Sequence, residues 1–185
     1  ISFEASPINF KYLKKKIEKN KQAYNNTEII LENIALGAEG KITEFKQFKE
    51  SSSSTIQKID EESKYYKRKF RLINFLNNKK IYETIQIKIS KLKDYIEKNN
   101  IKKIDFLKID TEGYEFEILL GLENKIQLVD IVMFEHHYDS MIQKSYTFAD
   151  INELLTKNNF NKIYKSRMPF RKTFEYIYRR EELIN

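Results

Sequence analysis

The chain has 185 residues, of which 41% are hydrophobic and 33% charged, a composition typical of one globular domain rather than a disordered tail. It contains no run of roughly 18 apolar residues, so we expect no membrane span and a cytoplasmic location. Cysteine is absent, which excludes disulfides and thiolate chemistry, and we assign no metal ligands. The formal net charge of +7 permits contact with phosphates or anionic surfaces without requiring it.

Helices and strands alternate along most of the chain. Ser6 and Pro7 form a typical helix start, a capping hydroxyl followed by proline at the first helical position. Apolar residues then recur at helical or alternating spacing. The predicted elements are the end of a strand at residues 1–3, a helix over 8–22, strands over 27–31, 41–48 and 84–89, a helix capped by Ser90, a buried strand over 104–109, a helix over 114–122 with Phe116, Leu119 and Leu120 inside, a strand over 129–134, a helix over 148–158 capped by Thr147, and strands over 160–164 and 173–178.

Residues of about 50–80 show no clean period. We interpret them as a polar, basic insertion or long connection with a helix around residues 61–76. The remaining strands are short and apolar, which predicts an α/β fold with a mostly parallel sheet and helices on both faces. The last two strands follow one another without a helix, which indicates an antiparallel edge.

Polar side chains follow three of the apolar runs, where ligands bind in open α/β sheets. These are Glu4, the pair Asp110 and Glu112, and Glu135 with its neighbours His136 and His137. Because parallel strands end at one edge, we expect Glu4, Asp110 and Glu135 to converge on a shared rim. Glu4 is placed either to accept ribose hydrogen bonds or to cap the following helix, and spacing alone does not separate these roles.

The segment from Asp110 to Gly113 is the densest polar cluster. A lysine within an apolar strand is costly unless paired, so Lys108 is expected to contact Asp110 or Glu112. The cluster is either a structural ion pair holding a turn, or a general base or metal ligand at the mouth of the sheet. His136 and His137 follow a buried strand, and each is either a structural histidine or a neutral imidazole able to accept a proton.

Several segments resemble one known family. Residues 104–121 are similar to the signature "DFLKIDVEGYE…L.G", with Thr111 where valine is usual. Residues 3–7 resemble "FEPNP", residues 33–37 resemble "N.ALG", and residues 131–135 resemble the later "I.LE" strand. Together these segments resemble the FkbM family of S-adenosylmethionine-dependent methyltransferases.

The resemblance implies a Rossmann-like class I methyltransferase fold that binds S-adenosylmethionine. It implies methyl transfer to a hydroxyl oxygen of a sugar, lipid or polyketide, so the partner is a small-molecule or glycan acceptor. By position, Glu4 would bind the cofactor ribose, and Asn33 and Ala35 would flank the adenine. The resemblance places Asp110 and Glu112, with Glu135 and His136 nearby, so that they face the methyl group and the acceptor.

The N-terminus departs from the family pattern, because the first strand and its glycine-rich loop are absent. We expect residues 1–185 to be a single, N-terminally truncated domain from a longer protein, and these residues alone to bind the cofactor poorly.

Two alternatives remain. The net charge of +7 with 12 Tyr and 13 Phe suits a basic nucleic-acid-binding module, although we expect no specific nucleic acid. An inactive methyltransferase-like fragment is the other. The sequence carries no signal for the oligomeric state.

Overall fold

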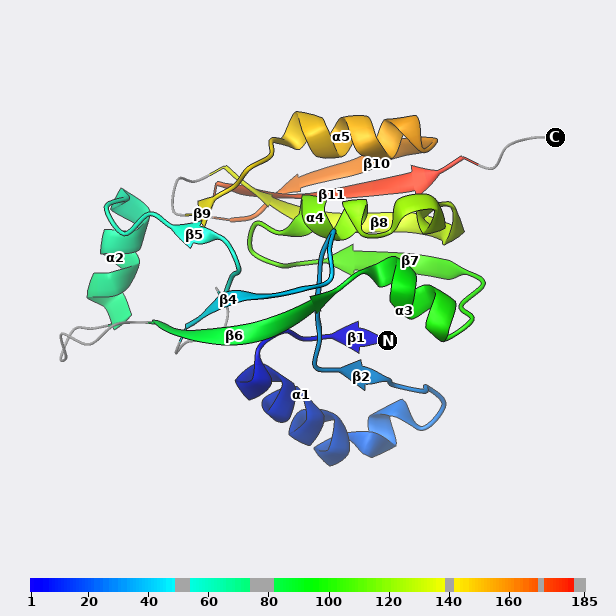
Figure 1. The fold of residues 1–185 in the computed structure, drawn as a ribbon, viewed down its shortest axis with the longest axis horizontal. Coiled ribbons are helices and arrows are strands. Elements are labelled where there is room, and N and C mark those ends of the chain that lie inside the picture. The colour runs from blue at the N-terminus through cyan, green and yellow to red at the C-terminus, as the bar shows by residue number, and fades with distance from the viewer. Residues whose placement is uncertain (49–53, 74–81, 139–141, 170–171, 182–185) are drawn as a thin grey trace.

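The computed structural model describes residues 1–48, 54–73, 82–138, 142–169 and 172–181 (Figure 1). Its helices are α1 (Pro7–Lys19), α2 (Lys64–Ile73), α3 (Leu92–Lys98), α4 (Glu115–Leu120) and α5 (Phe148–Lys157), with 3-10 helices η1 (Lys21–Tyr24) and η2 (Glu123–Leu128). Its strands are β1 (Ser2–Phe3), β2 (Leu31–Glu32), β3 (Ala35–Leu36), β4 (Lys41–Phe48), β5 (Lys58–Ile59), β6 (Tyr82–Ser90), β7 (Ile104–Ile109), β8 (Val129–His137), β9 (Ile142–Gln143), β10 (Phe160–Arg167) and β11 (Thr173–Arg180).

The described strands form small sheets of mixed direction. The largest has the order β10-β11-β8-β7, in which β8 runs parallel to β7 and antiparallel to β11. A second has the order β3-β6-β4, and β1 pairs in parallel with β2. The α/β class is confirmed, as is the antiparallel edge formed by β10 and β11. The prediction of one mostly parallel sheet is not confirmed. Strands β4 and β6 pair antiparallel, and a cavity separates β1 from β7.

The main core lies on one face of the largest sheet, under α4 and α5, and extends to buried residues of β3, β4, β6 and α3 (Figure 1). Phe134 and Tyr176 are almost fully buried there and stack with ring centroids 5.4 Å apart. Phe148 at the start of α5 stacks on Tyr176 at 4.4 Å, and Tyr178 donates a hydrogen bond of 2.7 Å to Asn152 of the same helix. Aromatic stacking and this hydrogen bond fix α5 over β11.

Strand β7 is not the buried strand that its sequence predicts. Only Ile109 is fully buried, whereas Phe106 is 52% exposed and Lys108 is exposed. Phe106 pairs with Ile131 of β8 and lines the cavity between β1 and β7. Burial here depends on what packs against the strand, which its apolar sequence does not specify.

Two helix starts are confirmed. Ser6 Oγ accepts the backbone N–H of Asn9 at 3.2 Å, and Thr147 forms a capping box with Asp150. The first predicted helix ends earlier than expected: α1 stops at Lys19, and the 3-10 helix η1 follows it.

Three local predictions were wrong. Residues 27–30 are not a strand, and only Leu31–Glu32 pairs with β1. Ser90 ends β6, and α3 begins after Lys91 without a side-chain cap. Leu120 is 37% exposed, because the short helix α4 turns Ile118 and Leu119 toward the core instead.

The described part of the region predicted as an insertion forms regular structure. Residues 54–59 run beside β4 and then form β5, which pairs with β9, and α2 covers much of the helix predicted over 61–76. Residues 50–53 and 74–80 lie outside the described residues. No helix in the described ranges is long and apolar enough to cross a membrane.

Two glycines join the smaller sheet to α4. A Cβ placed on Gly121 would lie 2.1 Å from the carbonyl oxygen of Gly37, which follows β3. Lys93 at the start of α3 donates its backbone N–H to the Gly121 carbonyl at 3.0 Å. Only the absence of a side chain permits this approach of two backbones.

We expect Gly121→Ala to lower the free energy of unfolding by about 2 kcal/mol, because backbone must shift to admit the methyl group. Gly40→Ala is the matched control, since its Cβ would meet nothing closer than 3.9 Å. Its effect should stay within about 0.5 kcal/mol. Urea unfolding of both variants checks this, and equal midpoints would contradict the close approach.

Candidate functional site

A cavity of about 960 Å³ lies between β1 and β7. Three acidic residues singled out by sequence line it, namely Glu4, Asp110 and Glu112. Apolar residues from both sides, including Phe3 and Phe106, complete the wall. The volume is in the usual range for small-molecule sites, and apolar walls with a few convergent polar groups are their usual lining.

Glu4 is held where β1 passes into α1. Its Oε1 accepts the backbone N–H of Ser6 at 2.8 Å, whereas it is the Ser6 side chain that caps α1. Burial raises the pKa of the Glu4 carboxyl, and hydrogen bonds from Ser6 and Asn9 oppose that shift. A carboxylate has about four lone-pair sites, so these two donors leave capacity for a ligand facing the cavity.

Asn33 and Ala35 lie on either side of the turn into β3. Asn33 Nδ2 donates to the carbonyl oxygen of Glu4 at 2.7 Å, which ties this turn to the end of β1. Ala35 is 4% exposed and lines the cavity. The structure therefore brings Glu4 and Ala35 to one cavity, with Asn33 supporting the backbone between them.

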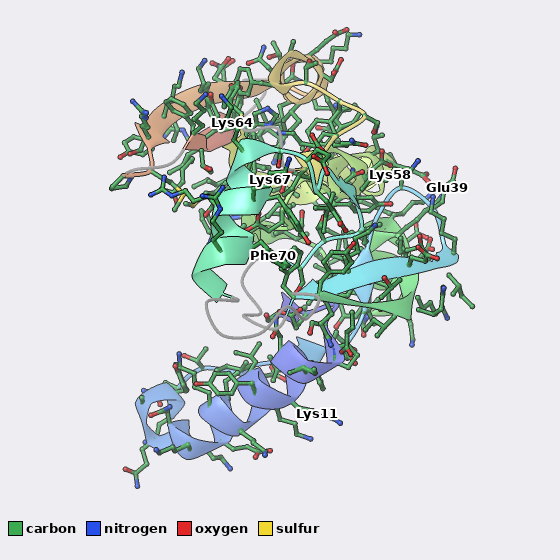
Figure 2. All side chains as sticks on the ribbon, turned by 90° about the vertical axis from the view of Figure 1, so that its left-hand side faces the viewer. Lys11, Glu39, Lys58, Lys64, Lys67 and Phe70 are labelled. Carbon is green, nitrogen blue, oxygen red and sulfur yellow. The ribbon has the colours of Figure 1, made fainter. Side chains whose placement is uncertain are left out.

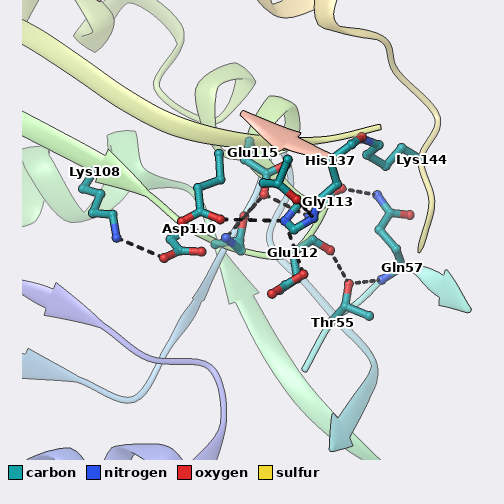
Figure 3. Close-up of polar contacts among 12 residues, drawn as sticks. Thr55, Gln57, Lys108, Asp110, Glu112, Gly113, Glu115, His137 and Lys144 are labelled. Carbon is teal, nitrogen blue, oxygen red and sulfur yellow. Dashed lines mark hydrogen bonds and ion pairs between the residues drawn. The ribbon is translucent and has the colours of Figure 1, made fainter. Parts of the chain in front are cut away.

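The loop after β7 carries the densest polar cluster (Figure 3). Lys108 Nζ lies 3.0 Å from Asp110 Oδ2, which confirms the predicted ion pair. This hydrogen bond is the main cause that raises the pKa of Lys108. The loop then turns through Glu112 at φ 51° and Gly113 at φ 95°, both in the left-handed region. Holding Glu112 there is costly, so other contacts must fix the loop.

The buried carboxylate of Glu115 supplies those contacts. Its Oε1 accepts the backbone N–H groups of Thr111 at 3.3 Å and Gly113 at 2.9 Å, and the Thr111 hydroxyl at 3.2 Å. Its Oε2 accepts the hydroxyl of Tyr146, and Glu115 itself is fully buried. Burial, followed by the charge of Glu115, raises the pKa of Tyr146. Glu115 was not singled out from the sequence, and its contact with Tyr146 joins residues 31 positions apart, which no local pattern marks.

The segment before β5 holds the same loop from the other side. Thr55 Oγ1 donates to the carbonyl oxygen of Glu112 at 2.8 Å, and Gln57 Nε2 donates to that of Gly113 at 2.9 Å (Figure 3). Part of the supposed insertion therefore supports the candidate site. No sequence period marked it, since single polar residues make these contacts.

The structure brings His137, and not His136, to the carboxylates. His136 is 3% exposed and packs edge-on against the rings of Tyr138, Tyr146 and Phe148. Burial lowers its pKa to about 4, with further lowering from the charges of nearby residues. Neighbours on a strand face opposite sides, which sends His136 into the core and His137 toward the loop.

His137 lies between two carboxylates and a hydroxyl. Its Nε2 is 3.4 Å from Glu112 Oε2 and 4.0 Å from Glu135 Oε2, and its Nδ1 is 3.0 Å from Thr173 Oγ1. Burial, and next the charge of Asp110, raises the pKa of Glu135. Asp110 and Glu135 thus share one electrostatic environment at the ends of β7 and β8.

Within the described ranges, no group of three or more His, Asp and Glu side chains is arranged to hold a metal ion. Of the three carboxylates predicted to share a rim, Glu4 and Asp110 line the cavity together with Glu112. Glu135 is not among the lining residues and lies 4.0 Å from His137, which in turn contacts Glu112.

Comparisons with known proteins give one match. The sequence profile of the methyltransferase FkbM domain matches residues 1–162. No curated protein matches the chain. No solved structure matches it either.

We expect Tyr146→Phe to lower the free energy of unfolding by about 2 kcal/mol, because the buried Glu115 carboxylate loses a hydroxyl donor. Tyr164→Phe removes a hydroxyl from a side chain that is 51% exposed and serves as the control. Its effect should be within about 0.5 kcal/mol. A similar loss in both variants would argue against a special role for the Glu115 contact.

We expect His136→Phe to flatten the pH dependence of stability between about pH 4 and 6.5. The folded pKa of His136 is lowered to about 4 from 6.5, so the unfolded chain binds a proton in this window and the folded chain does not. The His136 imidazole should therefore lower the free energy of unfolding of the wild type by about 2 kcal/mol between pH 7 and pH 5. Urea unfolding of wild type and variant at pH 7 and pH 5 measures the change in the free energy of unfolding. If that change is the same in both proteins, the lowered pKa of His136 is contradicted.

Proposed function

Because the chain belongs to the FkbM methyltransferase family, we propose that it transfers a methyl group from S-adenosylmethionine to a hydroxyl oxygen of a sugar, lipid or polyketide. The observation that carries the proposal is the cavity between β1 and β7, lined by Glu4, Asp110 and Glu112. The parallel pairs β1–β2 and β7–β8 on its two sides support a Rossmann-like arrangement of strands.

The residues around Glu4 fit the cofactor. A half-buried carboxylate at a strand end, with lone pairs to spare, suits the two hydroxyls of a ribose. Ala35 offers a flat apolar surface for the adenine, and Asn33 holds the adjoining turn against β1. When bound, S-adenosylmethionine supplies a methyl group already activated by the sulfonium.

The carboxylates at the ends of β7 and β8 serve the acceptor. An attacking hydroxyl must lose its proton, and Asp110 and Glu112 are cavity-lining carboxylate residues able to take it. His137 lies behind Glu112, where a positive charge would stabilise the carboxylate and a neutral ring would receive a proton. The loop contacts of Glu115, Thr55 and Gln57 keep these groups in place, which matters because positioning is the main task with an activated donor.

The proposal predicts separate effects on the two sides of the cavity. In the purified protein, Glu4→Gln should weaken S-adenosylmethionine binding by about 10-fold or more, because the ribose loses a charged acceptor. Asp110→Asn should lower kcat by about 100-fold while the dissociation constant stays within about 3-fold. Calorimetry measures binding, and release of S-adenosylhomocysteine with a panel of hydroxyl acceptors measures turnover.

Glu44→Gln on β4 removes the same charge from an exposed position and serves as the control. Unchanged turnover in Asp110→Asn with a genuine acceptor would remove that residue from the mechanism. Wild-type protein that shows no saturable cofactor binding would instead support the inactive-fragment alternative.

A further inference from the structure

Most of the net positive charge of this protein lies on one helix. Residues 7–24, which form α1 and η1, contain six lysines (Lys11, Lys14, Lys15, Lys16, Lys19 and Lys21) and a single carboxylate, Glu18. The segment therefore carries 6 − 1 = +5 of the formal +7. All six lysines are exposed, and within the described part of the chain none has a carboxylate partner.

Helix α1 is amphipathic in an unusual way. Phe10, Leu13 and Ile17 share the half-buried face that packs toward β2. At 100° per residue, Ile8 and Tyr12 fall on the opposite face, where they are 58% and 70% exposed. An aliphatic and an aromatic side chain thus stand in open solvent one helical turn apart.

Lysines surround these two side chains. On the same helical projection, Lys15 and Lys19 lie close to Ile8 and Tyr12, with Lys11 to one side. Figures 1 and 2 show α1 along the margin of the molecule in two perpendicular views, with its far side free of other segments, and Lys11 points away from the body. We define the outer face of α1 as Ile8, Lys11, Tyr12, Lys15 and Lys19.

We propose that the outer face of α1 docks on an anionic lipid surface. An aliphatic side chain, an interfacial tyrosine and a row of lysines are the chemistry with which a helix lies in a membrane interface. The lysines would meet anionic headgroups while Ile8 enters the acyl boundary. A nucleic acid would also attract the lysines, but it offers nothing apolar for Ile8, so a lipid surface fits the face better.

Docking would also orient the candidate site. Helix α1 begins directly after Glu4 and Ala5, and Asn9 in its first turn lines the cavity. An α1 lying on a membrane would therefore hold the cavity close to the lipid surface. The docking itself requires no methyl transfer, so it is tested without cofactor or acceptor.

The test is co-sedimentation of the purified protein with vesicles in 0.1 M salt. We expect binding to vesicles that contain 30% phosphatidylglycerol in phosphatidylcholine, little binding to phosphatidylcholine alone, and release at 0.5 M salt. The triple variant Lys11→Gln, Lys15→Gln, Lys19→Gln should lower the partition coefficient about 100-fold, because each lysine near an anionic surface strengthens binding several-fold. Ile8→Gln with Tyr12→Gln should lower it about 10-fold without a change in charge.

The matched control is Lys88→Gln, Lys98→Gln, Lys102→Gln, which removes three exposed charges from β6, α3 and the loop before β7. It should change the partition coefficient by less than about 3-fold. Equal losses in the two triple variants would mean that only net charge matters and would overturn the proposal. Absence of binding to anionic vesicles, or tighter binding to poly(U) through the same lysines, would overturn it as well.

Discussion

The buried carboxylate of Glu115 is the constraint on which the candidate site depends. A charged group with no solvent contact is stable only when its lone pairs are filled, and Glu115 fills them with two backbone N–H groups and two hydroxyls. In doing so it fixes the loop in which Glu112 adopts φ 51°. The position of Glu112 on the cavity wall therefore depends on the buried carboxylate of Glu115 in the first turn of the next helix.

The cavity exists because β1 and β7 stand apart. Each is paired on its other side, β1 with β2 and β7 with β8, so both are held by backbone hydrogen bonds. Their strand ends then present Glu4 and Asp110 to the same space. Lys108 neutralises Asp110 in part, which reduces the repulsion among carboxylates gathered on this wall.

Charge is distributed unevenly over the molecule. The cavity collects carboxylates, whereas α1 carries most of the net positive charge. The two regions adjoin, since α1 starts at the cavity wall. An acidic cavity thus lies beside a basic, partly apolar helix.

The sequence alone determined the family, the α/β class, the helix caps at Ser6 and Thr147, and the ion pair of Lys108 with Asp110. These depend on spacing within a few residues, where local geometry has few solutions. Only the tertiary structure decided that His137 faces the carboxylates and that Thr55 and Tyr146 support the loop. Those contacts join residues far apart in sequence. Strand pairing and packing determine which residues meet, and no local sequence pattern encodes them.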